Sequence, residues 1–448
     1  MKKVRKRSLF TVILAICLIA GTCLLVGRYI VNGSDWAGFS GNQSVYASGQ
    51  LSQGTVYDRN GVLLYDAETG SYNDSETIRK ATLHVVGDAE GMIATSALQE
   101  FSGLLSGFNL ITGTTAGGNE LYLTIDAELN AVAYEAMGDY KGCVAVYDYT
   151  TGEILCLVST PTYDPENVPE ISDDDDTYSG VYLNRFYSST FTPGSTFKIV
   201  TLAAAIENIS TLYTDTYECT GSCTLGDDTI TCTSAHGSQT ISEAFANSCN
   251  VTFAQLAATL GSETLASYAE EAGLTTSHAV NGITTATGNF TITTDTNLLG
   301  WSGVGQYEDL VNPCAMLRLM GAIANGGTPV EPRILKSQKS ELTGLPTNLF
   351  TSSTGDEIWS EETCELITTM MRNNVTTNYG QDRFGDLAVC AKSGTAETSS
   401  DDDTTWFVGF IDDEEYPYAF VVVCEDSGGY GSSVAGTIAA TVLNELCS

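Results

Sequence analysis

The amino terminus carries an uncharged apolar run from Leu9 to Val26, LFTVILAICLIAGTCLLV. About 18 to 20 apolar residues are enough to cross a bilayer as a helix. Five basic residues precede the run, in MKKVRKRS. The end of a membrane span that carries an excess of Lys and Arg stays on the cytoplasmic side. The alternative is a cleaved signal peptide, whose apolar region is normally about 7 to 15 residues and ends at a small-residue cleavage site. The run is longer than that and no Ala-x-Ala follows it, so we predict a single uncleaved anchor in the cell membrane, with the rest of the chain outside the cytoplasm.

The rest of the chain is strongly acidic. Acids outnumber bases by 55 to 19, which gives a formal net charge of -36, and six of the bases lie in the first 28 residues. A surface of this charge repels polyanions, so we expect no nucleic acid as a partner. With 448 residues, of which 43% are hydrophobic, the chain is long enough for about two to three domains.

Several stretches predict antiparallel strands. An Asn-Gly turn between two β-rich runs predicts a hairpin in residues 54–67, and the turn YTTG predicts another in residues 142–159. Residues 404–426 have the pattern of strand, turn and strand, and an apolar helix follows near the carboxyl terminus. Hairpins at both ends of residues 119–448, with helical patterns between them, predict an α+β fold in which helices cover an antiparallel sheet.

Thirteen cysteines raise the question of disulfides and metal sites. Cys17 and Cys23 lie in the apolar run, and most of the others stand alone in apolar stretches, where cysteine behaves as a small hydrophobic residue. Cys219, Cys223 and Cys232 cluster in YECTGSCTLGDDTITC, but no fourth Cys or His follows at the usual zinc spacing. We therefore favour a Cys219–Cys232 disulfide over zinc, with free thiols as the alternative for an organism that lives without oxygen.

A short stretch, TPGSTFK, places Ser195 three residues before Lys198. A serine is a weak nucleophile until a base takes its proton. None of the three histidines lies in a recognisable nucleophile context, and there is no Gly-x-Ser-x-Gly elbow, so a neutral lysine is the candidate base. If Ser195 opens a helix, as the preceding Pro-Gly favours, both side chains face the same way about one turn apart. The alternative is a surface serine and lysine that share a helix face.

Two further motifs follow along the chain. Ser248 and Asn250, in the sequence SCN, supply a hydroxyl and an amide on one short turn, although Ser-x-Asn alone is a weak signal. The sequence KSGT, residues 392–395, continues an apolar strand-like run with a cation and two hydroxyls beside a glycine. Lys392 is the only base after Arg383 in a tail rich in acids, so we expect it to meet an anion. An ordinary lysine on an edge strand is the alternative.

Together and in this order, the three motifs resemble the penicilloyl-serine transferase signature. The chain is similar to that family, and within it to the membrane-anchored class B penicillin-binding proteins, over most of residues 54–410. Segments with close family counterparts include GTVYDRNG, TIDAELNAVAYEAM, LNRFYSSTFTPGSTFK, HGSQTISEAFANSCNVTFAQLA and WFVGF. Gln53 stands where the family usually has an arginine before the glycine, and Ser393 replaces the commoner threonine but keeps its hydroxyl.

The resemblance implies a peptidoglycan D,D-transpeptidase that β-lactams acylate and inhibit. Ser195 would attack the carbonyl of the penultimate D-Ala of a stem peptide, and Lys198 would be the base that activates it. Ser248 would relay the proton to the departing D-Ala amine. An amine of a neighbouring stem peptide would then close the cross-link. The resemblance implies no metal and no cofactor.

The same resemblance implies a set of substrate-binding residues: Asn250, Lys392, Ser393, Gly394 and Thr395. Asn250 would hold the peptide amide. Lys392 and the two hydroxyls of its motif would bind the terminal carboxylate, and Lys392 would help to keep Lys198 neutral. Backbone N–H groups of Ser195 and Thr395 would form the oxyanion hole, often the largest single contribution to catalysis.

Related proteins differ in the fate of the acyl-enzyme. A β-lactamase needs a base that activates water, and the sequence indicates none. A D,D-carboxypeptidase differs only in admitting water instead of an amine, so this activity stays open. A β-lactam-sensing receptor usually has several membrane spans, whereas one is predicted here. A bifunctional synthase needs a glycosyltransferase domain, for which residues 32–118 are too few.

The resemblance also implies a division into three parts. These are a cytoplasmic tip and membrane anchor in residues 1–31, a non-catalytic pedestal in 32–118 and a transpeptidase domain in 119–448. A separate polytopic glycosyltransferase of the SEDS family would make the glycan strands and contact the anchor or the pedestal.

Overall fold

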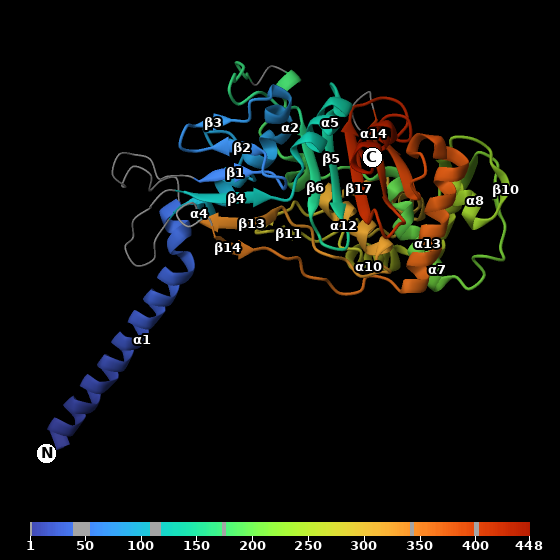
Figure 1. The fold of residues 1–448 in the computed structure, drawn as a ribbon. Helices are drawn as coiled ribbons and strands as arrows, with labels where there is room; N and C mark the ends of the chain where they lie inside the picture. The colour runs from blue at the N-terminus through green and yellow to red at the C-terminus, as the bar shows by residue number, and fades with distance from the viewer. Residues whose placement is uncertain (1, 39–53, 108–117, 173–175, 341–344, 398–402) are drawn as a thin grey trace.

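The structure is a computed structural model that describes residues 2–38, 54–107, 118–172, 176–340, 345–397 and 403–448. Helix α1 (Lys2–Gly38) contains the apolar run and projects away from the rest of the molecule (Figure 1). Within the described residues, one helix is long and apolar enough to cross a membrane. Within its segment Lys3–Gly33, an apolar stretch of 18 residues has a mean hydropathy of 2.8, and none of that stretch is buried. The structure thus agrees with the predicted anchor helix.

A five-stranded sheet forms the centre of the larger part of the molecule. Its strand order is β15-β16-β17-β5-β6, and all neighbouring strands are antiparallel. The strands are β5 (Lys141–Asp148), β6 (Ile154–Thr160), β15 (Val389–Ala396), β16 (Thr404–Ile411) and β17 (Tyr418–Glu425). β5 and β6 form the hairpin predicted in residues 142–159, and β16 and β17 form the strand pair predicted in residues 404–426.

Helices cover both faces of this sheet, which explains why its strands have nearly continuous apolar sequences. Val144 of β5 packs in one layer with α5 (Ala127–Met137) and α14 (Ala435–Leu446). Its neighbours Cys143 and Ala145 point to the opposite face and pack in the other layer. The predicted fold class, an antiparallel sheet covered by helices, is therefore confirmed (Figure 1).

The opposite layer consists of the helices between β6 and β15. They are α6 (Arg185–Ser188), α7 (Lys198–Asn208), α8 (Ile241–Ala246), α9 (Asn250–Leu260), α10 (Ser262–Glu271), α11 (Thr296–Val304), α12 (Pro313–Ala324) and α13 (Glu361–Asn374). Short strand pairs lie among them: β7 (Tyr217–Cys219) with β10 (Gly237–Gln239), β8 (Ser222–Leu225) with β9 (Asp228–Thr231), and β11 (Ala279–Val280) with β12 (Ile283–Thr284). Short 3-10 or π turns occupy Asp176–Tyr178, Gly194–Thr196, Val375–Tyr379 and Gln381–Phe384.

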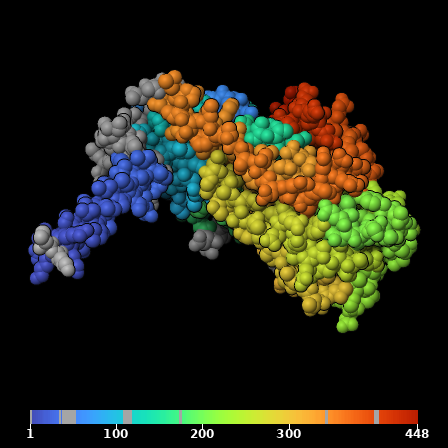
Figure 2. All heavy atoms as spheres, turned by 90° about the horizontal axis from the view of Figure 1, so that it is seen from below, coloured from blue at the N-terminus to red at the C-terminus, as the bar shows by residue number. Residues whose placement is uncertain are grey.

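A six-stranded sheet lies at the end of the molecule nearer to α1, in the order β14-β13-β4-β1-β2-β3. Its strands are β1 (Thr55–Tyr57), β2 (Leu63–Asp66), β3 (Ser71–Tyr72), β4 (Asn119–Leu123), β13 (Leu335–Ser340) and β14 (Pro346–Leu349). β1 and β2 are the hairpin predicted in residues 54–67. Because β13 pairs with β4, a late part of the chain joins this sheet to the helical layer. Figure 2 shows that segment in orange, running along one face between the two ends of the molecule.

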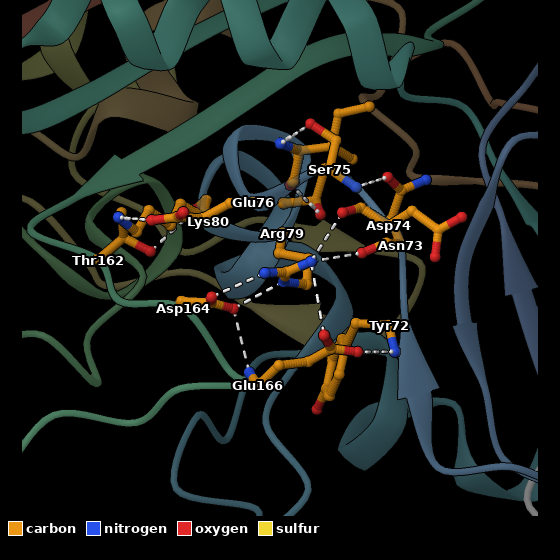
Figure 3. A network of polar contacts seen from close by, with 12 residues as sticks. Tyr72, Asn73, Asp74, Ser75, Glu76, Arg79, Lys80, Thr162, Asp164 and Glu166 are labelled. Carbon is orange, nitrogen blue, oxygen red and sulfur yellow. Dashed lines mark hydrogen bonds and ion pairs between the residues drawn. The ribbon is translucent and has the colours of Figure 1, made fainter.

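An ion-pair network connects this end of the molecule to the loop after β6 (Figure 3). Helix α2 (Glu76–Val86) carries Arg79, whose Nε and Nη2 donate to the two carboxylate oxygens of Asp164 at 2.7 and 2.8 Å. Its Nη1 lies 3.5 Å from Glu166. Only 10% of the Arg79 side chain and 9% of the Asp164 side chain are exposed. Hydrogen bonding to Arg79 lowers the pKa of Asp164. Helices α3 (Ala97–Glu100) and α4 (Ser102–Leu105) follow α2.

Replacing Arg79 with methionine should lower the free energy of unfolding by about 3 kcal/mol, because Asp164 would keep its charge in a poorly hydrated place without a partner. Lys80→Met is the matched control. Its ion pair with Glu76 is exposed and lies within one helix, so its loss should cost about 0.5 kcal/mol or less. Thermal unfolding of the three proteins gives the comparison. Equal midpoints for Arg79→Met and Lys80→Met would contradict a stabilising role of the network.

The cysteines differ from the prediction. All thirteen are free thiols, so the predicted Cys219–Cys232 disulfide is wrong in this structure. Cys143 and Cys390 are buried in strands of the five-stranded sheet, as expected of small hydrophobic residues.

Candidate active site

Ser195 and Lys198 lie where a 3-10 turn enters α7. Ser195 is in the turn Gly194–Thr196, and α7 begins at Lys198. The predicted helix therefore starts after the serine, but the tighter 3-10 turn also places residues three apart on one side. Lys198 Nζ lies 3.0 Å from Ser195 Oγ. The sequence prediction that these two side chains meet is borne out by this geometry.

The SCN motif forms the turn between α8 and α9, directly beside Lys198. Ser248 has a φ of 51°, a left-handed conformation that non-glycine residues seldom adopt, and Asn250 is the first residue of α9. Lys198 Nζ lies 2.6 Å from the carbonyl oxygen and 3.1 Å from the Oγ of Ser248, and 2.7 Å from Asn250 Oδ1. One amine thus joins the first two motifs.

The KSGT motif lies on β15 and brings the second lysine to the same place. Lys392 Nζ donates to Ser248 Oγ at 3.0 Å, so this hydroxyl lies between the two lysine amines. Ser393 donates from its N–H and its hydroxyl to the Tyr379 hydroxyl, at 3.1 and 3.0 Å. Tyr379, at the end of the π turn after α13, was missed by sequence reasoning because no motif marks it.

Both lysines are fully buried, and within the described residues no ion pair includes either of them. Lys198 faces the ring of Phe253 and Lys392 faces the ring of Phe245, with nitrogen-to-centroid distances of 5.8 and 5.7 Å. Burial, and then the nearby charge of Lys392, place the pKa of Lys198 well below its ordinary value. Burial lowers the pKa of Lys392 to about 7. The site therefore favours a neutral Lys198, which is what a base requires.

Glycines bring the segments that carry Ser195 and Thr395 into close contact. A Cβ added to Gly194, whose φ is +54°, would lie 2.7 Å from the carbonyl oxygen of Thr395. A Cβ added to Gly394 would lie 2.8 Å from the carbonyl oxygen of Pro193. The backbones of the turn and of β15 can approach this closely only without side chains at these positions. This accounts for the glycine in KSGT and places the backbone of Ser195 beside that of Thr395.

A cleft of about 920 Å³ gives access to the site. Motif residues that line it are Ser195, Ser248, Asn250, Ser393 and Thr395. The two buried lysines reach these residues from behind the lining. The structure therefore brings all the predicted site residues together around one cleft, an arrangement suited to serine acyl transfer with a lysine base.

Comparison with known proteins identifies the family. Residues 142–444 match the penicillin binding protein transpeptidase domain, and this is more than half of the chain. The chain therefore belongs to the penicillin-binding protein transpeptidase family, and the resemblance to its class B members is confirmed.

Individual relatives agree with this assignment. Peptidoglycan D,D-transpeptidase PbpA of Mycolicibacterium smegmatis is 27% identical over 360 residues, which are 75% of this chain and 73% of that protein. A crystal structure of PBPA from Mycobacterium tuberculosis has a TM-score of 0.78 at 22% identity, over 89% of this chain and 100% of that one. Its penicillin G acyl-enzyme complex has a TM-score of 0.73, also at 22% identity and over the same shares of the two chains. The structural likeness establishes the fold.

Proposed function

We propose that this chain cross-links peptidoglycan by acyl transfer on stem peptides that end in D-Ala-D-Ala, with Ser195 as the nucleophile. One observation carries the proposal: the buried Lys198 amine, with its lowered pKa, lies 3.0 Å from Ser195 Oγ. The same amine contacts Ser248 and Asn250. Family membership supports the reaction, as does the relative named as a peptidoglycan D,D-transpeptidase. The structure of a related acyl-enzyme with penicillin G supports inhibition by β-lactams.

Acylation begins when neutral Lys198 accepts the Ser195 proton, while Ser195 Oγ bonds to the carbonyl carbon of the penultimate D-Ala. Backbone N–H groups of Ser195 and Thr395 stabilise the negative oxygen that forms. As the C–N bond breaks, Ser248 gives its hydroxyl proton to the departing amine and takes the proton held by Lys198. The result is an ester on Ser195, free D-Ala and a neutral lysine.

Transfer to the acceptor reverses these proton movements. The amine of a second stem peptide attacks the ester carbonyl, and its proton passes through Ser248 to Lys198. Ser195 Oγ leaves and takes a proton back from Lys198, which restores the free enzyme. Glu397 and Asp403 also line the cleft, and these acids would attract a cationic acceptor amine.

Recognition of the substrate falls to the remaining motif residues. Lys392, with the hydroxyls of Ser393 and Thr395, would bind the terminal carboxylate, and a charged donor strengthens such bonds. The Asn250 side chain would hold the peptide amide. Tyr379 also lines the cleft, and because its hydroxyl accepts hydrogen bonds from the N–H and the hydroxyl of Ser393, we assign it the positioning of that hydroxyl.

Product analysis distinguishes cross-linking from hydrolysis. The full chain, in detergent, is given a peptide that ends in D-Ala-D-Ala together with a D-amino acid as acceptor. Transpeptidation yields a peptide in which the acceptor replaces the last D-Ala. A product that has only lost D-Ala would identify a D,D-carboxypeptidase. If no D-Ala is released, by transfer or by hydrolysis, the result contradicts the proposed reaction.

We also propose that α1 holds the amino terminus in the cytoplasm and the remaining chain outside. The five basic residues before the apolar run support this orientation. A phosphatase that is active only after export, fused behind Ser448, should then be active, and a fluorescent protein that folds only in the cytoplasm should be dark. Replacing the five basic residues with glutamine is the control, since it should weaken the orientation. A bright cytoplasmic fusion would contradict the topology and the role in the cell wall.

The division into an anchor (1–31), a pedestal (32–118) and a transpeptidase domain (119–448) stays a proposal, supported by a family match that falls within the third part. In the six-stranded sheet, β4 and β13 from that part continue the pedestal strands, so the two parts should move together. The partner that polymerises the glycan would be a SEDS-family glycosyltransferase that contacts α1 or the pedestal. Co-purification of the full chain with such a protein, and its loss when α1 is exchanged for an unrelated span, tests this contact.

A further inference from the structure

Four potential metal ligands meet behind the SCN motif. They are Cys219 at the end of β7, Cys232 just after β9, His236 just before β10, and Cys249 between α8 and α9. Their ligand atoms all lie within 4.8 Å of one another. Three sulfurs and one imidazole nitrogen are a common ligand set for a structural zinc site.

Two distances within this cluster are close to those of a tetrahedron around zinc. Zn–S bonds of about 2.3 Å and Zn–N bonds of about 2.0 Å place two sulfurs about 3.8 Å apart, and a sulfur and a nitrogen about 3.6 Å apart. Cys232 Sγ lies 4.0 Å from Cys249 Sγ and 3.6 Å from His236 Nδ1. A sulfur pair at 4.0 Å is about twice as long as a disulfide bond.

Polar contacts around the cluster hold the ligands in position. His236 Nε2 lies 3.1 Å from Ser234 Oγ, so Nδ1 is the nitrogen that faces the cysteines. The backbone N–H of Asn250 donates to Cys232 Sγ at 3.3 Å. Such outer contacts orient ligands and stabilise negative charge on sulfur in metal sites.

We propose that Cys219, Cys232, His236 and Cys249 bind one zinc ion. A disulfide would join only two of the three cysteines and leave the third beside the imidazole without a role. Zinc accounts for all four residues, and this proposal departs from the expectation from the sequence of no metal at this place. Two of the four ligands, His236 and Cys249, lie outside the cysteine cluster that the sequence indicated. Cys249 belongs to the catalytic motif and is distant in sequence from Cys219.

The zinc ion would position the catalytic turn. Cys249 lies between Ser248 and Asn250, the two residues that contact Lys198. Ser248 has a left-handed backbone conformation, which costs free energy and must be held by its surroundings. A bond from zinc to Cys249, and the contact of Cys232 with the Asn250 N–H, would fix this turn from behind. The metal site itself does not depend on the proposed function, whereas its effect on acylation does.

The first test uses the unaltered full chain, purified in detergent with a reductant and without added metal. Elemental analysis should find about one zinc ion per chain, and X-ray absorption at the zinc edge should find three sulfur neighbours and one nitrogen neighbour. Absence of zinc, together with no uptake of added Zn²⁺ or Co²⁺, would overturn the proposal. A Cys219–Cys232 disulfide in that protein would overturn it as well.

The second test compares two serine substitutions in the same segment. Cys219→Ser should lose zinc and should be acylated by penicillin about tenfold more slowly. Loss of residues that hold a metal site in position lowers activity on about this scale. Cys223→Ser should keep zinc and the original rate, since Cys223 lies outside the cluster. Zinc loss in both variants would overturn the ligand assignment. Zinc loss without slower acylation in Cys219→Ser would overturn the positioning role.

Discussion

Replacing Lys198 with methionine should slow acylation of the chain by penicillin roughly 10² to 10⁴-fold, the usual contribution of a positioned general base. Among the described residues, the Lys198 amine is the only side-chain nitrogen that forms a hydrogen bond with Ser195 Oγ. Methionine fills a similar volume but accepts no proton, so Ser195 would have to attack as an alcohol. Lys392 does not substitute for it, because its amine contacts Ser248 and not Ser195.

The measurement is the second-order rate constant for acylation by a fluorescent penicillin. Lys80→Met is the control for loss of a lysine remote from the cleft, and it should react at the original rate. Because the carbonyl of Ser248 and the amide of Asn250 lose a partner in Lys198→Met, thermal unfolding must show that the variant is folded. A folded Lys198→Met that acylates at the original rate would exclude this lysine as the base.

Replacing Lys392 with glutamine should reduce acylation roughly 30-fold or more, since loss of a buried charge partner costs about 2 kcal/mol or more. It should also change the dependence on pH. Lys198 acts when neutral, and the charge of Lys392 is one of the causes that lower its pKa. Removing that charge raises the pKa of Lys198, so the rise of the rate with pH should move to higher pH. Burial is the larger cause, and glutamine should therefore leave part of the lowering in place.

Lys392→Arg separates charge from shape. In the unaltered protein the rate should fall above about pH 7, where Lys392 begins to lose the charge that binds the carboxylate. Arginine stays charged, so this fall should disappear, although the different shape of its head group should keep the rate below the original. The three proteins are compared by their acylation rates from pH 5 to 10, measured at about one point per half pH unit. An unchanged rising limb in Lys392→Gln would show that Lys392 only binds substrate and that burial alone keeps Lys198 neutral.

Much of the fold was predictable from local sequence. The YTTG turn between apolar runs gives β5 and β6, and the uncharged run after the basic residues gives α1. The six-stranded sheet was not predictable in the same way. β13 pairs with β4 across more than two hundred residues, and β14 is exposed along its whole length, so neither has a hydrophobic pattern that indicates its partner.

The site shows the same division between local and distant signals. Ser195, Lys198 and the other motif residues were found because each motif is short and keeps a fixed order. Tyr379 and His236 were not found, since each acts through a contact that only the folded chain creates. The preference for a disulfide failed for the same reason: Cys249 joins the cluster through the packing of α9 against the short strands β7, β8 and β9.

Peptide mapping after reaction with penicillin tests the central claim most directly. The full chain is incubated with penicillin, digested, and examined by mass spectrometry for the penicilloyl adduct. We predict one adduct, on the peptide that contains Ser195, and none on a Ser195→Ala chain treated in the same way. An adduct that persists in Ser195→Ala, or that maps to a different serine of the unaltered chain, would contradict the assignment of Ser195 as the nucleophile.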